Sequence, residues 1–324
     1  MKALSLFSGG LDSILAAKLI ERQGIDVKGI FLETPFFSSE KALKYSEYLG
    51  FPLKVIDITD DYIDMLLQPK HGYGKGLNPC IDCHIFMLRV VGSMLQKEGA
   101  GFIISGEVLG QRPMSQNVRS LMTISKESGF ADLIIRPLSA KRLRESLPEK
   151  AGWLKRGELL GFSGRSRRPQ IELAGRLGIR NYPAPAGGCL LTDRVFSRRL
   201  RDLISASAVL ERRDIELLKW GRHFRIEKEA KVIVGRNKRE NEIISSLAVK
   251  NDIVLTDDSY PGPTVLASKN ISADGLRLAT SIAASYSNAP PNHPVALKML
   301  RGSKTHRGVG YGKGRGYFSQ FMIR

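Results

Sequence analysis

The chain has 324 residues, of which 42% are hydrophobic and 25% charged, so it is long enough for two globular domains. No stretch approaches the ~18–20 apolar residues of a bilayer-spanning helix, and no signal-peptide pattern is present, so we expect a cytoplasmic protein without a membrane partner. The formal net charge is +18, and the excess lies mainly in residues 136–225 and 298–324. Such uneven basic charge favours a polyanion, in general a nucleic acid, as the partner.

The first 136 residues alternate short apolar runs, typical of strands, with amphipathic stretches, typical of helices. The strands are predicted at 2–7, 26–32, 53–57, 101–105 and 132–136, and the helices at 12–23, 38–49, 60–68, 81–98 and 113–127. This alternation predicts an α/β fold, a doubly wound parallel sheet with its ligand at the carboxyl ends of the strands.

The second half of the chain has a different pattern. We expect a strongly basic helical region over 139–180, a Pro- and Gly-rich loop up to residue 189, and a basic helix pair over 195–219. Three β-rich runs and one helix follow, at 231–235, 252–256, 264–267 and 274–286. We therefore predict an α/β domain over 1–195, a smaller basic α+β domain over 196–290, and a mobile, basic, glycine-rich tail over 291–324.

The segment Ser-Gly-Gly-Leu-Asp-Ser, residues 8–13, follows the first predicted strand directly and opens the first helix. Backbone N–H groups and a helix N-terminus meet at such a point, which suits phosphate or pyrophosphate. Glycine allows a close backbone approach, serine donates hydroxyl hydrogen bonds, and aspartate can hold Mg²⁺. The predicted phosphate-binding residues are Ser8, Gly9, Gly10, Asp12 and Ser13. The competing interpretation is an ordinary strand–turn–helix with a polar N-cap.

Two further strand ends are expected at the same edge of the sheet. Phe31 and Leu32 end the second strand, and Gly106 follows a later one. All three are candidates for contact with the nucleotide, adenine lying against Phe31 and Leu32. The first two are equally consistent with plain core positions.

The chain has three cysteines, Cys80 and Cys83 in C-x-x-C spacing and the remote Cys189. Several interpretations remain open. With His84 the pair matches a haem-attachment pattern, which needs an exported chain. A thioredoxin-type redox pair, a Cys₃His zinc site and an inert buried trio are the others.

Residues 8–13 resemble the SGGxDS signature of the PP-loop ATP pyrophosphatases. That resemblance implies a HUP-like domain that cleaves ATP between the α- and β-phosphates and attaches AMP to a substrate oxygen, with Mg²⁺ as cofactor. Asn78-Pro79-Cys80-x-x-Cys83 is similar to the MnmA-like tRNA 2-thiouridylases. A third cysteine in this arrangement looks more like the TtuA group, whose three cysteines hold a 4Fe–4S cluster. The resemblance implies catalytic roles for Asp12, Cys80 and Cys189, and a cluster on Cys80, Cys83 and Cys189; a two-cysteine persulfide route stays open.

Residues 221–290 resemble a different module. Gly221-Arg-His-Phe-Arg225, Gly235-Arg-Asn237, Glu240-Asn241 and Pro261-Gly-Pro-Thr264 are similar to the RNA-binding domain of NFACT proteins. Together the two resemblances imply ATP-dependent tRNA uridine thiolation, 2-thiouridine being favoured over 4-thiouridine. The implied partners are tRNA and a sulfur donor, either free sulfide or a persulfide or sulfur-carrier protein. The alternatives are a non-catalytic RNA- or ribosome-binding protein with a vestigial nucleotide loop, and a small-molecule ATP pyrophosphatase.

Overall fold

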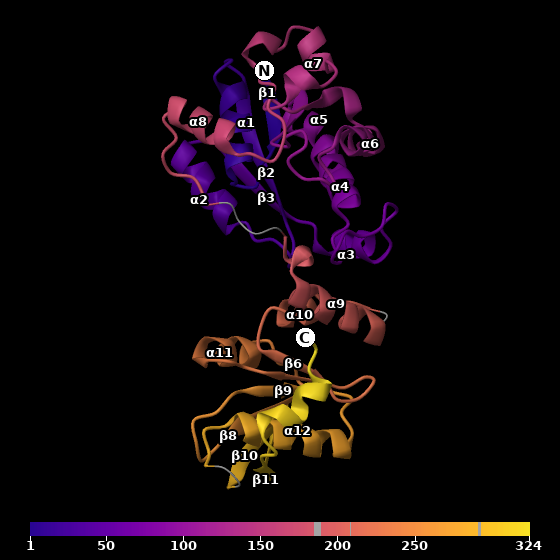
Figure 1. Ribbon diagram of the computed structural model, residues 1–324, viewed down its shortest axis with the longest axis vertical. Helices are drawn as coiled ribbons and strands as arrows, with labels where there is room; N and C mark the ends of the chain where they lie inside the picture. The colour runs from indigo at the N-terminus through magenta and orange to yellow at the C-terminus, as the bar shows by residue number, and fades with distance from the viewer. Residues whose placement is uncertain (185–188, 208, 291–292) are drawn as a thin grey trace. The chain divides into compact units, whose positions relative to one another are not determined.

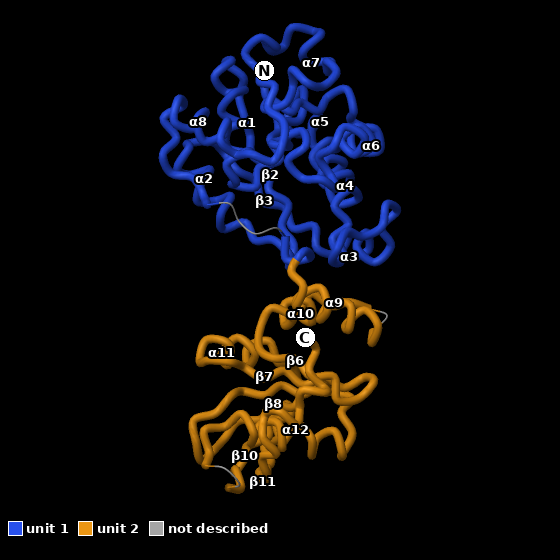
Figure 2. The backbone as a smooth tube through the Cα atoms, viewed as in Figure 1, with its two compact units in different colours: residues 1–192 blue, residues 193–324 orange. Residues whose placement is uncertain are grey.

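The structure is a computed structural model that describes residues 1–184, 189–207, 209–290 and 293–324. The chain divides into two compact units, residues 1–192 and 193–324, shown in blue and orange in Figure 2. The division lies close to the boundary predicted at residue 195. No helix among the described residues is long and apolar enough to cross a membrane.

Residues 1–192 contain a five-stranded parallel sheet in the order β3-β2-β1-β4-β5, which confirms the predicted doubly wound fold. Figure 1 shows its helices on both faces of the sheet. The strands are β1 (Lys2–Leu6), β2 (Asp26–Glu33), β3 (Leu53–Asp57), β4 (Phe102–Ser105) and β5 (Ile134–Ile135). The helices are α1 (Leu11–Glu21), α2 (Glu40–Leu49), α3 (Thr59–Leu67), α4 (Cys80–Ser93), α5 (Leu95–Glu98), α6 (Val118–Ser128), α7 (Leu147–Lys150) and α8 (Arg168–Arg176).

The core of this unit forms around the central strand. Ala3 and Leu4 of β1 are fully buried, because a parallel strand with helices on both faces has no side exposed to water. Helix α1 is buried almost all round, and its Ile14 and Ile20 join the same core. The strand and the helix that flank residues 8–13 are therefore held rigidly, which fixes the turn between them.

Residues 139–180 differ from the prediction of a basic helical region. The structure has only the short α7, helix α8 and brief 3₁₀ turns there. Pro148 and Pro169 each stand at the start of a helix, and Gly152 and Gly164 adopt positive φ, so regular structure is interrupted repeatedly. The basic side chains therefore extend from loops rather than from one long helix.

Residues 193–324 form a six-stranded antiparallel sheet in the order β11-β10-β8-β9-β7-β6, which agrees with the predicted α+β class. The strands are β6 (Arg222–Arg225), β7 (Lys231–Val234), β8 (Ile253–Asp257), β9 (Val265–Ala267), β10 (Pro294–Arg301) and β11 (Lys304–Tyr311). The helices are α9 (Arg194–Ala206), α10 (Arg212–Leu217), α11 (Lys238–Ser246) and α12 (Ala273–Tyr286).

Two helices cover opposite faces of this second sheet. Helix α12 packs on one face, where Ile282 and Phe224 lie in a shared core. Helix α11 packs on the other face through Ile244, against Ile233 and Leu266. The second core therefore covers β7 and β9 on both sides.

The prediction of a mobile tail over 291–324 is wrong. Its described residues form the β10–β11 hairpin and a 3₁₀ turn, Arg315–Phe321, whose Phe318 is fully buried. At least one glycine that suggested mobility serves close packing: a Cβ on Gly310 would lie 2.7 Å from the Thr280 carbonyl oxygen of α12. The glycine-rich, basic composition of this segment therefore led to a prediction of disorder where two strands form.

Candidate active site

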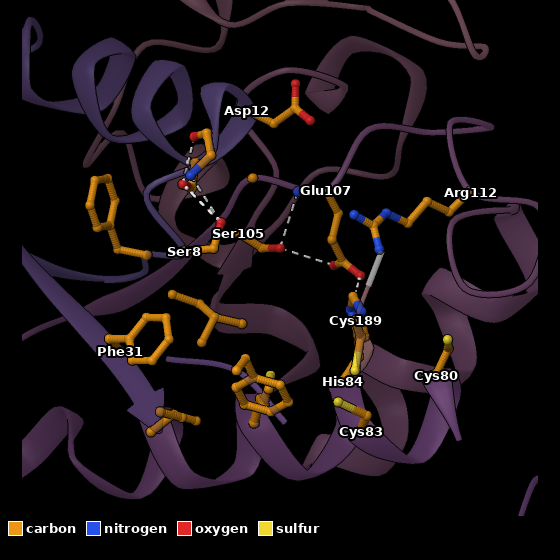
Figure 3. Close-up of a pocket in the computed structure, with 18 of the residues that line it drawn as sticks. Ser8, Asp12, Phe31, Cys80, Cys83, His84, Ser105, Glu107, Arg112 and Cys189 are labelled. Carbon is orange, nitrogen blue, oxygen red and sulfur yellow. Dashed lines mark hydrogen bonds and ion pairs between the residues drawn. The ribbon is translucent and has the colours of Figure 1, made fainter. Parts of the chain in front are cut away.

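A cavity of about 750 Å³ lies in residues 1–192, at the carboxyl ends of β1, β2 and β4. This volume is within the range of ordinary ligand sites, and the position is the one at which doubly wound sheets bind ligands. Figure 3 shows Ser8, Asp12 and Phe31 on one side of it and the three cysteines on the other, with Ser105 and Glu107 between them. We call these sides the nucleotide end and the cysteine end.

The nucleotide end is formed by the turn between β1 and α1. Gly10 is the N-cap residue of α1 in an extended conformation, and no side chain caps the helix, so N–H groups of the first turn are available to a ligand. Ser13 Oγ donates to the Gly10 carbonyl at 2.8 Å and lies 3.2 Å from Ser8 Oγ. An anion placed here would meet backbone N–H groups and two hydroxyls.

Gly9, predicted to bind phosphate, packs on α2 instead of lining the cavity. It adopts φ +69°, and a Cβ there would lie 2.7 Å from the Lys41 carbonyl oxygen of α2. It is not among the described residues that line the cavity. Gly9 therefore allows the close packing of the turn on α2, while Gly10 faces the cavity.

Asp12 has one satisfied carboxylate oxygen and one unsatisfied oxygen. Gln111 Nε2 donates to Oδ2 at 2.9 Å, and Gln111 Oε1 accepts from Gln170 Nε2 at 3.3 Å. Oδ1 is buried and has no hydrogen-bond partner among the described residues. A buried carboxylate oxygen without a partner is unfavourable, and hard oxygen ligands are those that Mg²⁺ prefers. The residues present thus fit a magnesium ion bound to Asp12.

The cysteine end is formed by the first turn of α4 and by Cys189. All three cysteines line the cavity. The Asn78 side-chain amide donates to Cys80 Sγ at 3.2 Å, and the buried Tyr62 hydroxyl donates to Cys83 Sγ at 3.4 Å. Burial raises the pKa of Cys83 to about 12 and that of Cys189 to about 11. These two thiols are therefore protonated at neutral pH in the unliganded protein.

Comparison with known proteins finds one family match in each of the two units. Residues 1–142 match the family described as thiamine biosynthesis protein (ThiI), and residues 221–310 match the NFACT protein RNA binding domain. The chain contains a ThiI-type PP-loop domain and an NFACT-type RNA-binding domain. The resemblances to the PP-loop tRNA-thiolation enzymes and to the NFACT RNA-binding domain are thereby confirmed. Neither match extends to Cys189, so the TtuA-like set of three cysteines stays a prediction.

The curated relatives match only part of their own length. A tRNA-specific 2-thiouridylase MnmA of Campylobacter curvus is 30% identical over 27% of this chain and 28% of that protein. A probable tRNA sulfurtransferase of Streptococcus gordonii is 28% identical over 42% of this chain and 34% of that protein. The chain thus spans about a third or less of these relatives. Among solved structures, an NMN synthetase of Francisella tularensis aligns at 14% identity over 57% of this chain and 89% of its own, with a TM-score of 0.28.

An ionic network lies between the two ends of the PP-loop cavity. Glu107 follows β4 and is buried; it accepts from Arg136 Nε at 2.8 Å and from Ser105 Oγ at 3.0 Å. His84 Nδ1 lies 2.7 Å from its other oxygen. Burial opposes ionisation of Glu107, but the charges of Arg136 and His84 outweigh it and hold its pKa well below the usual range. Glu107 is therefore a carboxylate that orients the His84 ring.

The three cysteines are candidate ligands of a metal or cluster. Thiolates are the donors that iron–sulfur clusters and zinc select, and three of them face one cavity. Within the described residues, however, no group of three or more His, Cys, Asp or Glu is arranged to hold a metal ion. The donor type fits a cluster, while the arrangement does not already form its site. Gly187 and Gly188, in the predicted loop before Cys189, lie outside the described residues.

Most of the predicted site residues meet in this cavity. It is lined by Ser8, Gly10, Asp12, Ser13, Phe31, Leu32, Cys80, Cys83, Gly106 and Cys189. Phe31 and Leu32 are also largely buried, as core residues would be, and their contact with adenine stays a prediction. Gly106 lies against α1, where a Cβ would be 2.7 Å from the Ser13 backbone nitrogen, so a larger residue there would clash with the first turn of α1.

Sequence reasoning missed several lining or supporting groups. Lys41, Arg165 and Arg167 add positive charge to the cavity wall. Arg136, the partner of Glu107, ends an apolar strand run, and a charge in that position was the signal that could have found it. Tyr62 had no sequence signal, because an aromatic residue on an amphipathic helix is read as core.

Proposed function

We propose that this chain is an ATP-dependent enzyme that replaces a carbonyl oxygen of a tRNA uridine with sulfur. The observation that supports this best is the union, in one cavity, of an uncapped helix N-terminus with three cysteines. The names of the curated relatives, a 2-thiouridylase and a sulfurtransferase acting on tRNA, point to the same chemistry. The NFACT-type domain supplies a reason for RNA as the substrate.

The nucleotide end activates the uridine. The uridine oxygen attacks the α-phosphorus of ATP, the bond to the β-phosphate breaks, and pyrophosphate leaves. The first turn of α1, Ser8 and Ser13 would bind the phosphates, and Asp12 would hold Mg²⁺. These groups are aimed at the charge that develops on the leaving group, which is where fixed dipoles lower a barrier most. Phe31 and Leu32 would face the adenine.

The cysteine end supplies the sulfur. Cys80, Cys83 and Cys189 would hold a 4Fe–4S cluster, whose chemistry at this site would be to supply sulfide. Tyr62 and Asn78 orient two of the thiols. Sulfur bonds to the activated ring carbon, the carbon–oxygen bond breaks, and the oxygen departs with AMP. The other route uses a persulfide that a persulfide donor forms on Cys80 or Cys189. Its outer sulfur bonds to the ring carbon as AMP leaves. The second cysteine then attacks the inner sulfur, the S–S bond breaks, the sulfur stays on the uridine and a disulfide remains.

The direct test is nucleoside mass spectrometry of bulk tRNA from cells with and without the gene. We expect one thiouridine to disappear, 2-thiouridine in preference to 4-thiouridine, and to return with the wild-type gene but not with Asp12→Asn. Unchanged thionucleosides would overturn the proposal. Pyrophosphate release from ATP without tRNA, unaffected by Cys80→Ser, would instead favour a small-molecule pyrophosphatase.

A further inference from the structure

One face of the β10–β11 hairpin differs from the rest of the second sheet. Side chains alternate along a strand, and Val295, Leu297 and Gly310 point to the α12 side, where they are buried. The residues between them point to the opposite side. We call this second side the open hairpin face; it consists of Ala296, Lys298, Leu300, Thr305, Arg307, Val309 and Tyr311.

Exposure shows that the second core does not extend over this face. The cluster around α11 ends at Val254 of β8, which pairs with Leu300 of β10. On β11, the strand on the other side of β10, Val309 is 55% exposed and Tyr311 is 65% exposed. An exposed aromatic ring and an exposed aliphatic side chain on the same strand face form an apolar surface that a partner can cover.

The charges on the open hairpin face are positive. Lys298 and Arg307 stand directly opposite each other in the hairpin. Arg307 forms an ion pair with Asp258 at 3.2 Å, but its side chain remains 81% exposed, and Lys298 has no ion pair among the residues described. The chain contains no Asp or Glu after Asp274, whereas seven Lys and Arg lie within 298–324. The complement of this surface is therefore an anionic partner with apolar faces.

Unpaired nucleotides have this combination. Single-stranded RNA offers base faces that stack on aromatic side chains, and phosphates that contact Lys and Arg. An A-form duplex has its bases stacked inside and offers phosphates and hydroxyls instead. A tyrosine on an open sheet face suits the first kind of partner better than the second.

We propose that the open hairpin face binds unpaired nucleotides of the RNA substrate, with Tyr311 stacked against a base and Lys298 and Arg307 contacting the flanking phosphates. The inference rests on the proposed function only in taking RNA as the partner. It adds that this part of the NFACT-type domain recognises single-stranded regions of the tRNA rather than its helices.

The test measures binding of the full-length protein to two RNAs by fluorescence anisotropy. One is an unstructured single strand and the other a blunt duplex with the same number of phosphates. Tyr311→Ala is expected to weaken single-strand binding by about 5- to 100-fold, the usual cost of losing one base–aromatic stack, with little change for the duplex. Tyr311→Phe keeps the ring and is expected to bind like wild type.

Tyr317→Ala is the matched control. Tyr317 is also exposed, at 48%, but it lies on the 3₁₀ turn whose Phe318 packs in the α12 core, away from the open hairpin face. We expect it to leave both affinities unchanged. The double variant Lys298→Gln/Arg307→Gln is expected to reduce the slope of log K against log salt by about 1–2, which Tyr311→Ala does not do.

Three results would overturn the inference: equal losses on both RNAs for Tyr311→Ala, an equal loss for Tyr317→Ala, or no binding of the single strand by wild type. A concentration-dependent dimer that Tyr311→Ala abolishes would assign the face to a second copy instead. Binding is measured without ATP or sulfide, so it can succeed where thiolation fails. If deletion of the gene removes a thiouridine from tRNA but Tyr311→Ala does not selectively weaken single-strand binding, this inference is overturned and the proposed function stands.

Discussion

The two ends of the cavity are built in different ways. The nucleotide end comes from one strand–turn–helix, in which β1 and α1 are largely buried and local hydrogen bonds hold the turn. The cysteine end joins the first turn of α4 to Cys189, more than 100 residues away in the sequence, and its described residues do not form a closed metal site. In the proposed reaction the backbone would preorganise phosphate binding, whereas sulfur transfer would require the three cysteines to be deprotonated and brought together. The predictions below test that difference, from the largest expected effect to the smallest.

The cysteine variants separate the two ends most sharply. Cys80→Ser, Cys83→Ser and Cys189→Ser are each expected to abolish thiouridine formation, because a hydroxyl replaces a sulfur ligand or nucleophile. ATP affinity is expected to stay within about 3-fold of wild type, since the phosphates bind elsewhere. The measurements are thionucleoside yield and ATP titration. Full activity in any one of the three would remove that cysteine from the mechanism.

Asp12→Asn tests the nucleotide end. The unpartnered Oδ1 loses its charge, so we expect tRNA-dependent pyrophosphate release to fall by about 10²–10³-fold, the range found when one preorganised electrostatic contact is lost. Asp26→Asn, at an exposed position at the start of β2, is the control and should be near wild type. A rate within a factor of a few of wild type for Asp12→Asn would contradict the magnesium assignment.

Arg136→Met tests the network between the ends. It leaves Glu107 buried without its strongest partner, so the free energy of unfolding is expected to fall by about 3–5 kcal/mol in urea denaturation. Glu107→Gln in the same chain should recover part of the loss. Lys70→Met removes an exposed ion pair with Glu127 and is expected to leave the free energy of unfolding nearly unchanged. Equal losses for the two single variants would show that the buried pair is not important for the fold.

The pH dependence of alkylation reports the state of the cysteine end. Because burial raises the pKa of Cys83 and Cys189 to about 12 and 11, their thiolate fractions rise about tenfold per pH unit through pH 7–10. Timed iodoacetamide labelling, read by peptide mass spectrometry on metal-free protein, is expected to accelerate over that range without a plateau. A plateau below pH 9 at either residue would show a thiolate already formed and a cysteine end as preorganised as the nucleotide end.

The parts of the fold and site that local sequence determines could be predicted, and most of those that depend on residues distant in sequence could not. Buried parallel strands read as apolar runs, so the five strands of the first sheet and residues 8–13 were placed correctly. The packing role of Gly9 depends on α2, which is distant in sequence, and no local pattern indicates it. The charge at the end of an apolar run marks Arg136, but the local pattern does not identify its partner Glu107. The β10–β11 hairpin was missed because glycine there serves close packing against α12 and was taken as a sign of mobility. The breaks in 139–180 were underestimated, because basic residues of high helix propensity outweighed the scattered Pro and Gly.

The central claim is that one cavity couples ATP cleavage to sulfur insertion. The most direct measurement supplies the full chain, reconstituted with iron and sulfide under anaerobic conditions, with ATP and unmodified tRNA, and counts pyrophosphate and thiouridine in the same reaction. We expect both products to depend on tRNA and to form in about equal amounts, with Cys189→Ser making no thiouridine. Pyrophosphate formed at the same rate without tRNA, with no thiouridine at any enzyme concentration, would contradict the account.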